Sequence, residues 1–189
     1  MTRLAFDRVA CLRGGRLLFE DLSLTLRAGE AALVTGANGA GKSSLLRLAA
    51  GLLGPSAGEI AREGKVALAA EAAALDEDSS LFAALAFWAQ LDGQNDEAVA
   101  LALAAMGLAP IAEVPVRLLS TGQRRRATIA RVIASGAPIW LLDEPASGLD
   151  AASLDALAGV MAGHRASGGI ILAASHQPIG LDDVREVAL

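Results

Sequence analysis

The chain has 189 residues, of which 53% are hydrophobic, and a formal net charge of −5. This length and composition predict a single domain with a sizeable core. The acidic balance excludes a general nucleic-acid binder, whose affinity comes from many contacts of lysine and arginine with phosphate, and the single cysteine, Cys11, excludes an intrachain disulfide.

Two uncharged stretches raise the question of a membrane span. Residues 98–112 and 167–181 carry no charge, but both are shorter than the roughly 20 apolar residues that a spanning helix needs. Proline residues interrupt both stretches. We therefore expect a soluble chain that meets a membrane only through a partner.

The first part of the chain predicts an antiparallel hairpin, a buried strand, a glycine loop and a helix. Residues 4–9 and 22–26 alternate apolar and polar side chains on either side of the turn RGGR, as half-buried strands do. Apolar residues 31–35 end at the loop GANGAGKS, and KSSLLRLAAG then has helical spacing up to a stop at Gly51. Residues 59–60 and 65–70 predict further strands.

The middle of the chain, about residues 72–134, is rich in alanine and leucine. This composition predicts helices. One helix is expected over residues 80–91. Another is expected over residues 96–106, between an N-cap at Asn95 and a stop at Gly107. We interpret this part as a helical lobe inserted into an α/β core.

The core resumes near the C-terminal end. An apolar run at 139–142 predicts a buried strand, followed by a helix over 151–162 and a strand over 169–174. The fold class is therefore α/β, with an antiparallel β portion at the start and an inserted helical subdomain. The expected division is one domain, 1–189, with a core of about 1–71 and 135–189 and a helical subdomain of about 72–134.

The glycine loop carries the clearest chemistry. Gly36, Gly41, Lys42 and Ser43 satisfy the pattern GxxxxGK[ST], with a strand before it and a helix after it. In such a loop, backbone N–H groups surround the β-phosphate of ATP, Lys42 reaches the β- and γ-phosphates, and the Ser43 hydroxyl binds Mg²⁺. A chance match is disfavoured by the flanking elements. The expected ATP contacts are Gly36, Ala37, Asn38, Gly39, Ala40, Gly41, Lys42, Ser43 and Ser44.

Two carboxylates and a histidine follow predicted strands. Asp143 ends an apolar run, where its carboxylate can hold Mg²⁺ beside Ser43, and Glu144 can then serve as general base for the attacking water. Without the glycine loop, this DEP segment would be interpreted as the start of a loop. His176 follows the strand over 169–174 and can donate to the γ-phosphate, or be a structural histidine.

A second segment, LSTGQRRR at residues 119–126, also has the features of a phosphate site. Small residues with free backbone N–H groups open a helix, and cations follow. The alternative is an ordinary capped helix whose three arginines, 124–126, form a solvated face. One nucleotide needs only one such site, so the second requires an explanation.

The motifs GANGAGKS, LSTGQ, IWLLDEP, SGLD and SH, in this order, resemble the ATP-binding cassette (ABC) ATPases over nearly the whole chain. The resemblance implies a P-loop NTPase core of ABC type, in which two nucleotide-binding subunits pair head to tail. The second phosphate site then serves the ATP of a second copy of the chain. It implies that Ser120, Thr121, Gly122, Gln123 and Asp150 line the seam between the two copies.

Two positions depart from the family pattern. Many cassettes stack an aromatic residue on adenine, but this chain has Arg13 near the corresponding turn and no tyrosine. The guanidinium of Arg13 can stack on the base, or remain in solvent. The family also has a glutamine after the strand at 65–70, where this chain has Ala72, and the adjacent Glu71 can either bind Mg²⁺ in its place or face solvent.

Within the family, the pair Phe87-Trp88 and the segments GQRRR and SHQP resemble the ATP-binding subunit of the bacterial haem exporters used in cytochrome c maturation. This implies a peripheral protein on the cytoplasmic face of the inner membrane, bound to a separate transmembrane subunit. Its ATP use would drive haem delivery or release of a haem-loaded chaperone. The alternatives are the ATPase of another small ABC transporter, a cassette of the ribosome or DNA-repair type, and a degenerate cassette that binds ATP with little turnover.

Overall fold

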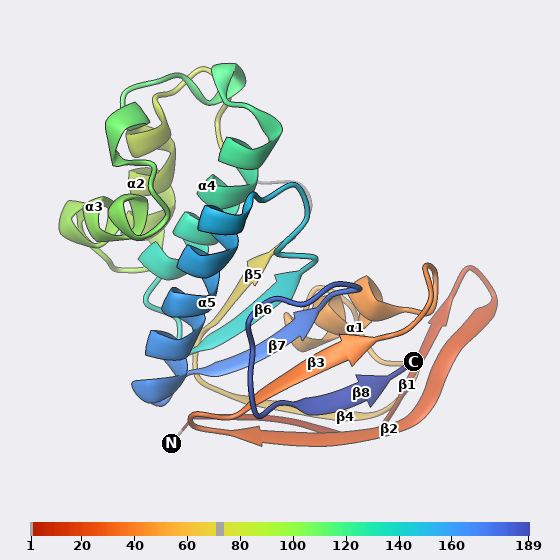
Figure 1. The fold of residues 1–189 in the computed structure, drawn as a ribbon. Coiled ribbons are helices and arrows are strands. Elements are labelled where there is room, and N and C mark those ends of the chain that lie inside the picture. The colour runs from red at the N-terminus through yellow and green to blue at the C-terminus, as the bar shows by residue number, and fades with distance from the viewer. Residues whose placement is uncertain (1, 71–73) are drawn as a thin grey trace.

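The computed structural model describes residues 2–70 and 74–189, and two sheets form its framework (Figure 1). The smaller sheet is antiparallel, with the strand order β2-β1-β4. It comprises β1 (Arg3–Arg13), β2 (Arg16–Arg27) and β4 (Ala57–Glu63). Strands β1 and β2 form a hairpin whose turn, Gly14 and Gly15, has φ values of 54° and 77°, which glycine adopts without steric cost. The predicted hairpin is confirmed, with longer strands.

The larger sheet is parallel and holds the site at one edge. Its strand order is β5-β6-β7-β3-β8. The strands are β3 (Ala31–Thr35), β5 (Val66–Ala69), β6 (Ile139–Asp143), β7 (Ile170–Ala174) and β8 (Arg185–Ala188). Every residue of β7 is buried, and so are the first four residues of β6, which explains their unbroken apolar sequence. Because all five strands run in one direction, the segments that follow them gather at the same edge.

Helices cover the parallel sheet on both faces. Helix α1 (Lys42–Ala49) packs between the two sheets, and α5 (Ala151–Ala166) covers the opposite face (Figure 1). The helical lobe contains α2 (Leu81–Leu91), α3 (Asp96–Ala105) and α4 (Thr121–Ala134). Two short 3₁₀ turns, η1 (Ala109–Ile111) and η2 (Val116–Leu118), connect α3 to α4. The α/β fold with an antiparallel portion and inserted helices is confirmed.

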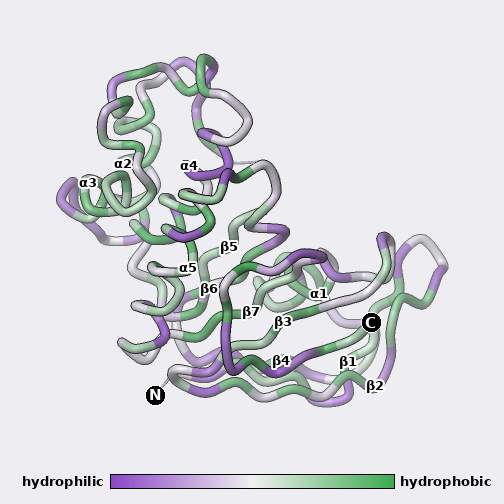
Figure 2. Tube along the Cα trace, in the orientation of Figure 1, coloured by the Kyte–Doolittle hydropathy of each residue, from purple (hydrophilic) through white to green (hydrophobic). Residues whose placement is uncertain are grey.

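Two hydrophobic clusters fill the space around the parallel sheet. One joins α1 to the antiparallel sheet and to one face of the parallel sheet. The other continues from the opposite face of the parallel sheet through α5 into the helical lobe. Figure 2 shows the hydrophobic residues that run along the central strands. The second cluster includes residues of both α4 and β5, and these two elements are in contact.

Helices α2, α3, α4 and α5 each start at a residue whose side chain caps the helix N-terminus. Ser80, Asn95, Ser120 and Asp150 each accept a hydrogen bond from the backbone N–H three residues ahead, which satisfies a donor that the helix cannot use internally. The predicted N-cap at Asn95 is confirmed. Among the residues that the structure describes, no helix is long and apolar enough to cross a membrane.

Candidate nucleotide site

The glycine loop connects β3 to α1, and its glycines are required by backbone geometry. Gly36, Gly39 and Gly41 have φ values of 140°, 82° and 117°, in the region that side chains disfavour. A Cβ on Gly36 would lie 2.7 Å from the carbonyl oxygen of Leu189, and one on Gly41 would lie 3.1 Å from the ring of Phe19. The loop is therefore held between the last strand and the antiparallel sheet.

Lys42 begins helix α1 and bends back over this loop. Its side chain is largely buried, and Nζ donates hydrogen bonds to the carbonyl oxygens of Gly36 at 2.8 Å and Ala37 at 3.3 Å. Gly41, the N-cap of α1, offers no side-chain cap, so the first N–H groups of the helix remain available to an anion. A positive charge and open backbone donors thus meet at one helix terminus, as a phosphate group requires.

Asp143 ends β6 and Glu144 follows it, at the carboxyl edge of the parallel sheet. Asp143 Oδ1 is buried and has no hydrogen-bond partner among the described residues. A buried carboxylate oxygen is costly to leave unpaired, so its position suits a cation. Glu144 has a φ of 48°, and its N–H donates to the carbonyl oxygen of Ala174 at 2.8 Å. This left-handed backbone turns the two neighbouring carboxylates in different directions.

His176 follows the adjacent strand β7 and contacts Glu144. Nδ1 of His176 lies 2.7 Å from Oε2 of Glu144, and the His176 N–H donates to the same oxygen at 3.3 Å. Asp143 pairs with Ala174 in the sheet, which places the two following segments side by side. The His176 side chain is 62% exposed and that of Glu144 is 26% exposed, so both remain accessible to a ligand.

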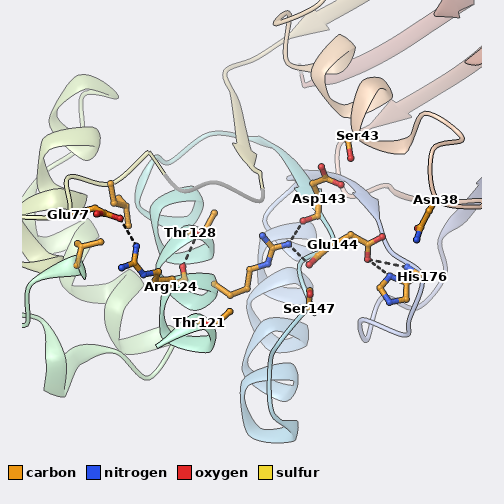
Figure 3. Close-up of a pocket in the computed structure, with 13 residues that line it drawn as sticks. Asn38, Ser43, Glu77, Thr121, Arg124, Thr128, Asp143, Glu144, Ser147 and His176 are labelled. Carbon is orange, nitrogen blue, oxygen red and sulfur yellow. Dashed lines mark hydrogen bonds and ion pairs between the residues drawn. The ribbon is translucent and has the colours of Figure 1, made fainter. Parts of the chain in front are cut away.

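A cavity of about 810 Å³ brings these groups together (Figure 3). Ser43, Asp143, Glu144, His176 and Asn38 lie on one side of it, and Thr121 with Arg124 lies on the other. Such a volume is typical of a small-molecule site. Arg125 of the LSTGQRRR segment and Ser147 of the SGLD segment also line the cavity. The remaining lining residues, which the sequence did not suggest, are Leu75, Glu77, Val116 and Thr128.

Other predicted site residues lie at helix starts. Ser120 and Gln123 form a reciprocal cap: Ser120 Oγ accepts from the Gln123 N–H at 3.3 Å, and the Ser120 N–H donates to Gln123 Oε1 at 2.8 Å. A Cβ on Gly122 would lie 3.0 Å from the carbonyl oxygen of Gly148, so this glycine allows α4 to approach the SGLD segment. Ser120 and Thr121 are exposed.

Asp150 caps α5 by accepting a hydrogen bond from the N–H of Ser153 at 2.8 Å. Hydrogen bonds from the side chain and backbone of Ser153 lower the pKa of the Asp150 carboxyl. Arg13 lies exposed beside the hairpin turn and is not among the residues that line the cavity. Glu71 and Ala72, the positions of the suggested metal ligand and the absent glutamine, lie outside the described residues.

The interpretation of the three consecutive arginines as a solvated face is wrong for Arg125. This side chain is buried and donates to the carbonyl oxygens of Ala70, Asp143 and Glu144. Within three consecutive arginines, the residue type alone does not show which side chain is buried. The available signal was helical spacing, because Arg125 lies on the same face of α4 as the buried Ile129 and Val132.

Comparison with known proteins identifies the class. The family model described as ABC transporter matches residues 19–147. An ABC exporter of the bacterial Atm1 family, solved with ATP bound, has a TM-score of 0.85 at 22% identity, covering 100% of this chain and 37% of that one. An ATP-binding cassette solved in its ADP conformation has a TM-score of 0.82 at 18% identity, covering 100% and 87%. These two structures support the fold alone. The family match shows that the chain belongs to the ABC transporter family, as an ATP-binding subunit that hydrolyses ATP.

More similar relatives share one name. A protein of Sphingopyxis alaskensis is 56% identical over 98% of this chain and 96% of its own length. Another, from Zymomonas mobilis subsp. mobilis, is 57% identical over 99% of this chain and 84% of its own length. Both are named cytochrome c biogenesis ATP-binding export protein CcmA.

Proposed function

We propose that the chain is the ATP-hydrolysing subunit of an exporter that serves cytochrome c biogenesis, with haem as the transported group. The observation that carries this proposal is the near full-length identity of 56–57% with two CcmA proteins. The site supports it, because the groups proposed to hold Mg²⁺ and to activate water line one cavity together with Asn38 of the glycine loop. ATP use would drive haem delivery or the release of a haem-loaded chaperone.

The residues of the site divide the work of hydrolysis. N–H groups of the glycine loop and the ammonium group of Lys42 hold the phosphates. Ser43 and Asp143 would hold Mg²⁺, which supplies charge neutralisation at the β- and γ-phosphate oxygens. Glu144 takes the proton of the attacking water at its carboxylate. His176 holds that carboxylate through Nδ1 and its backbone N–H, and in the imidazolium form, in which both ring nitrogens donate, Nε2 can also donate to the γ-phosphate.

A second copy of the chain completes each site. The exposed N-terminus of α4 at Ser120 and Thr121 offers backbone donors and a hydroxyl, and in a head-to-tail pair these groups meet the γ-phosphate held by the other copy's glycine loop. Asp150 and the SGLD segment lie along the same seam. A separate transmembrane subunit would hold the pair at the cytoplasmic face of the inner membrane.

Replacement of His176 by alanine tests its catalytic role. We expect His176→Ala to lower kcat by about 10²-fold, within the range of a lost proton-transfer or positioning group, with little change in Tm because the side chain is mostly exposed. Steady-state ATPase assays and thermal denaturation measure the two effects. A variant that keeps its specific activity but loses stability would assign His176 a structural role instead.

The cellular function is tested by replacing the chromosomal gene with one that encodes Glu144→Gln. We expect cells to accumulate the variant protein at the normal level, checked by immunoblot, but to lose holocytochromes c on gels stained for haem peroxidase activity. The wild-type gene supplied on a plasmid should restore them. Normal levels of c-type cytochromes in the variant strain would contradict the proposed role and favour another small ABC transporter.

A further inference from the structure

We propose that Arg125 is a positioning residue for hydrolysis, which holds the backbone of Glu144 in the conformation that directs its carboxylate into the site. The proposal rests on the proposed role of Glu144 as general base. It adds a connection within one subunit, from the helix that faces the partner's nucleotide to that subunit's own base. Arg125 acts through Glu144, so it is distinct from the groups that contact ATP.

The contacts of Arg125 converge on the ends of two parallel strands. Its Nη1 donates to the carbonyl oxygen of Ala70 at 3.2 Å, just after β5. Its Nη2 donates to the carbonyl oxygens of Asp143 and Glu144, at the end of β6. The guanidinium is buried where it makes these contacts. One side chain of α4 therefore fixes two strand ends of the core.

These contacts restrain the backbone torsion angle φ of Glu144. Rotation about φ changes the orientation of the Asp143–Glu144 peptide relative to the Glu144 carbonyl group. Arg125 binds the carbonyl oxygens on both sides of this rotation, and Ala174 binds the Glu144 N–H at 2.8 Å. The angle is 48°, which residues other than glycine seldom adopt unless their surroundings impose it. Arg125 supplies two of these restraints, and the N–H of Ser147, which donates to the Glu144 carbonyl oxygen at 3.1 Å, adds another.

Arg125 lies in the first turns of α4, so a movement of this helix would be passed on to the backbone of Glu144. The helix starts at the Ser120 cap, which we propose faces the partner's nucleotide, and Arg125 lies five residues further along. A shift of α4 on closure of the pair would move the guanidinium and, with it, the backbone of Glu144. Arginine suits this task because its planar fork carries several donors, whereas lysine provides a single point charge.

A double-mutant cycle tests whether Arg125 acts through Glu144. In Arg125→Met, which keeps an apolar stem, we expect kcat to fall about 10- to 100-fold, as small misplacements of a catalytic group do, with KM for ATP near the wild-type value. In a Glu144→Gln background, the same substitution should reduce the residual rate little further. Arg131→Met is the matched control, because Arg131 also lies in α4 but its guanidinium packs over the ring of Trp88 at 4.3 Å; its kcat should stay near wild type.

Each outcome decides the proposal. A wild-type kcat in Arg125→Met, or losses that multiply fully with those of Glu144→Gln, would overturn it, because a general structural role adds independently. If Arg125→Met does not fold, Arg125→Lys carries the test: it should bind ATP normally and show a reduced kcat, and wild-type turnover would overturn the proposal. A wild-type protein without ATPase activity, by contrast, would refute the proposed function itself.

Discussion

Glu144→Gln is expected to lower kcat by about 10²- to 10⁴-fold, the contribution of a general base, while ATP binding is retained. Glutamine has the shape of glutamate and can still accept from His176, but its amide cannot take a proton from water. Because hydrolysis no longer separates the two copies, the head-to-tail pair should accumulate in the presence of Mg-ATP. One substitution should therefore both abolish most ATP hydrolysis and stabilise the head-to-tail dimer.

Light scattering coupled to size-exclusion chromatography measures this accumulation. The Glu144→Gln variant should elute as a dimer at saturating Mg-ATP and as a monomer without nucleotide. The matched comparison is wild type under the same conditions, which should dimerise only transiently. If the variant stayed monomeric at saturating Mg-ATP, the interpretation of the second phosphate site would lose its main support.

Lys42→Met is the second substitution with a large expected effect. Among the described residues, Lys42 is the one cation whose side chain donates hydrogen bonds to the glycine loop. A hydrogen bond to a charged group contributes roughly 1.5–3 kcal/mol to the binding free energy. We therefore expect ATP to bind about 10- to 100-fold more weakly, with hydrolysis lost. Isothermal titration of Mg-ATP measures the affinity.

The chain offers a matched control for this substitution. Its second lysine, Lys65, lies between β4 and β5 and donates to the backbone carbonyl of Asp92 at 2.8 Å instead of to the glycine loop. Lys65→Met removes the same ammonium group from the protein and should bind ATP as the wild type does. Equal affinities for Lys42→Met and wild type would contradict the phosphate-binding role.

Sequence patterns predicted the elements whose burial leaves a periodic signal. The buried strands β3, β6 and β7 appear as apolar runs, and the glycine loop has a spacing that few other structures produce. Strand β8 left no such signal and was not predicted, because it is an edge strand in which most residues are exposed. It nevertheless matters, since Leu189 just beyond it donates its N–H to Thr35, at the start of the loop, at 3.0 Å.

The sequence predicts which residues form the site, but not how they are placed relative to one another. Glu144 and His176 are 32 positions apart, and their contact depends on β6 and β7 being neighbours, which no local pattern reveals. The left-handed φ of Glu144 and the burial of Arg125 are likewise tertiary properties. A hydrophilic run such as residues 124–126 has the same composition whether it faces solvent or, as here, partly closes the core.

We propose that each site is built from two copies of the chain, and a mixture of two inactive variants shows whether it is. Lys42→Met lacks a working glycine loop, and Gly122→Asp places a carboxylate at the start of α4, where the γ-phosphate of the other copy would lie. Each should be nearly inactive alone, with Gly122→Asp still binding ATP. Mixed, they should recover ATPase activity, because half of the sites in each mixed pair then combine an intact loop with an intact helix start. A mixture as inactive as its separate components, or a fully active Gly122→Asp, would contradict the claim.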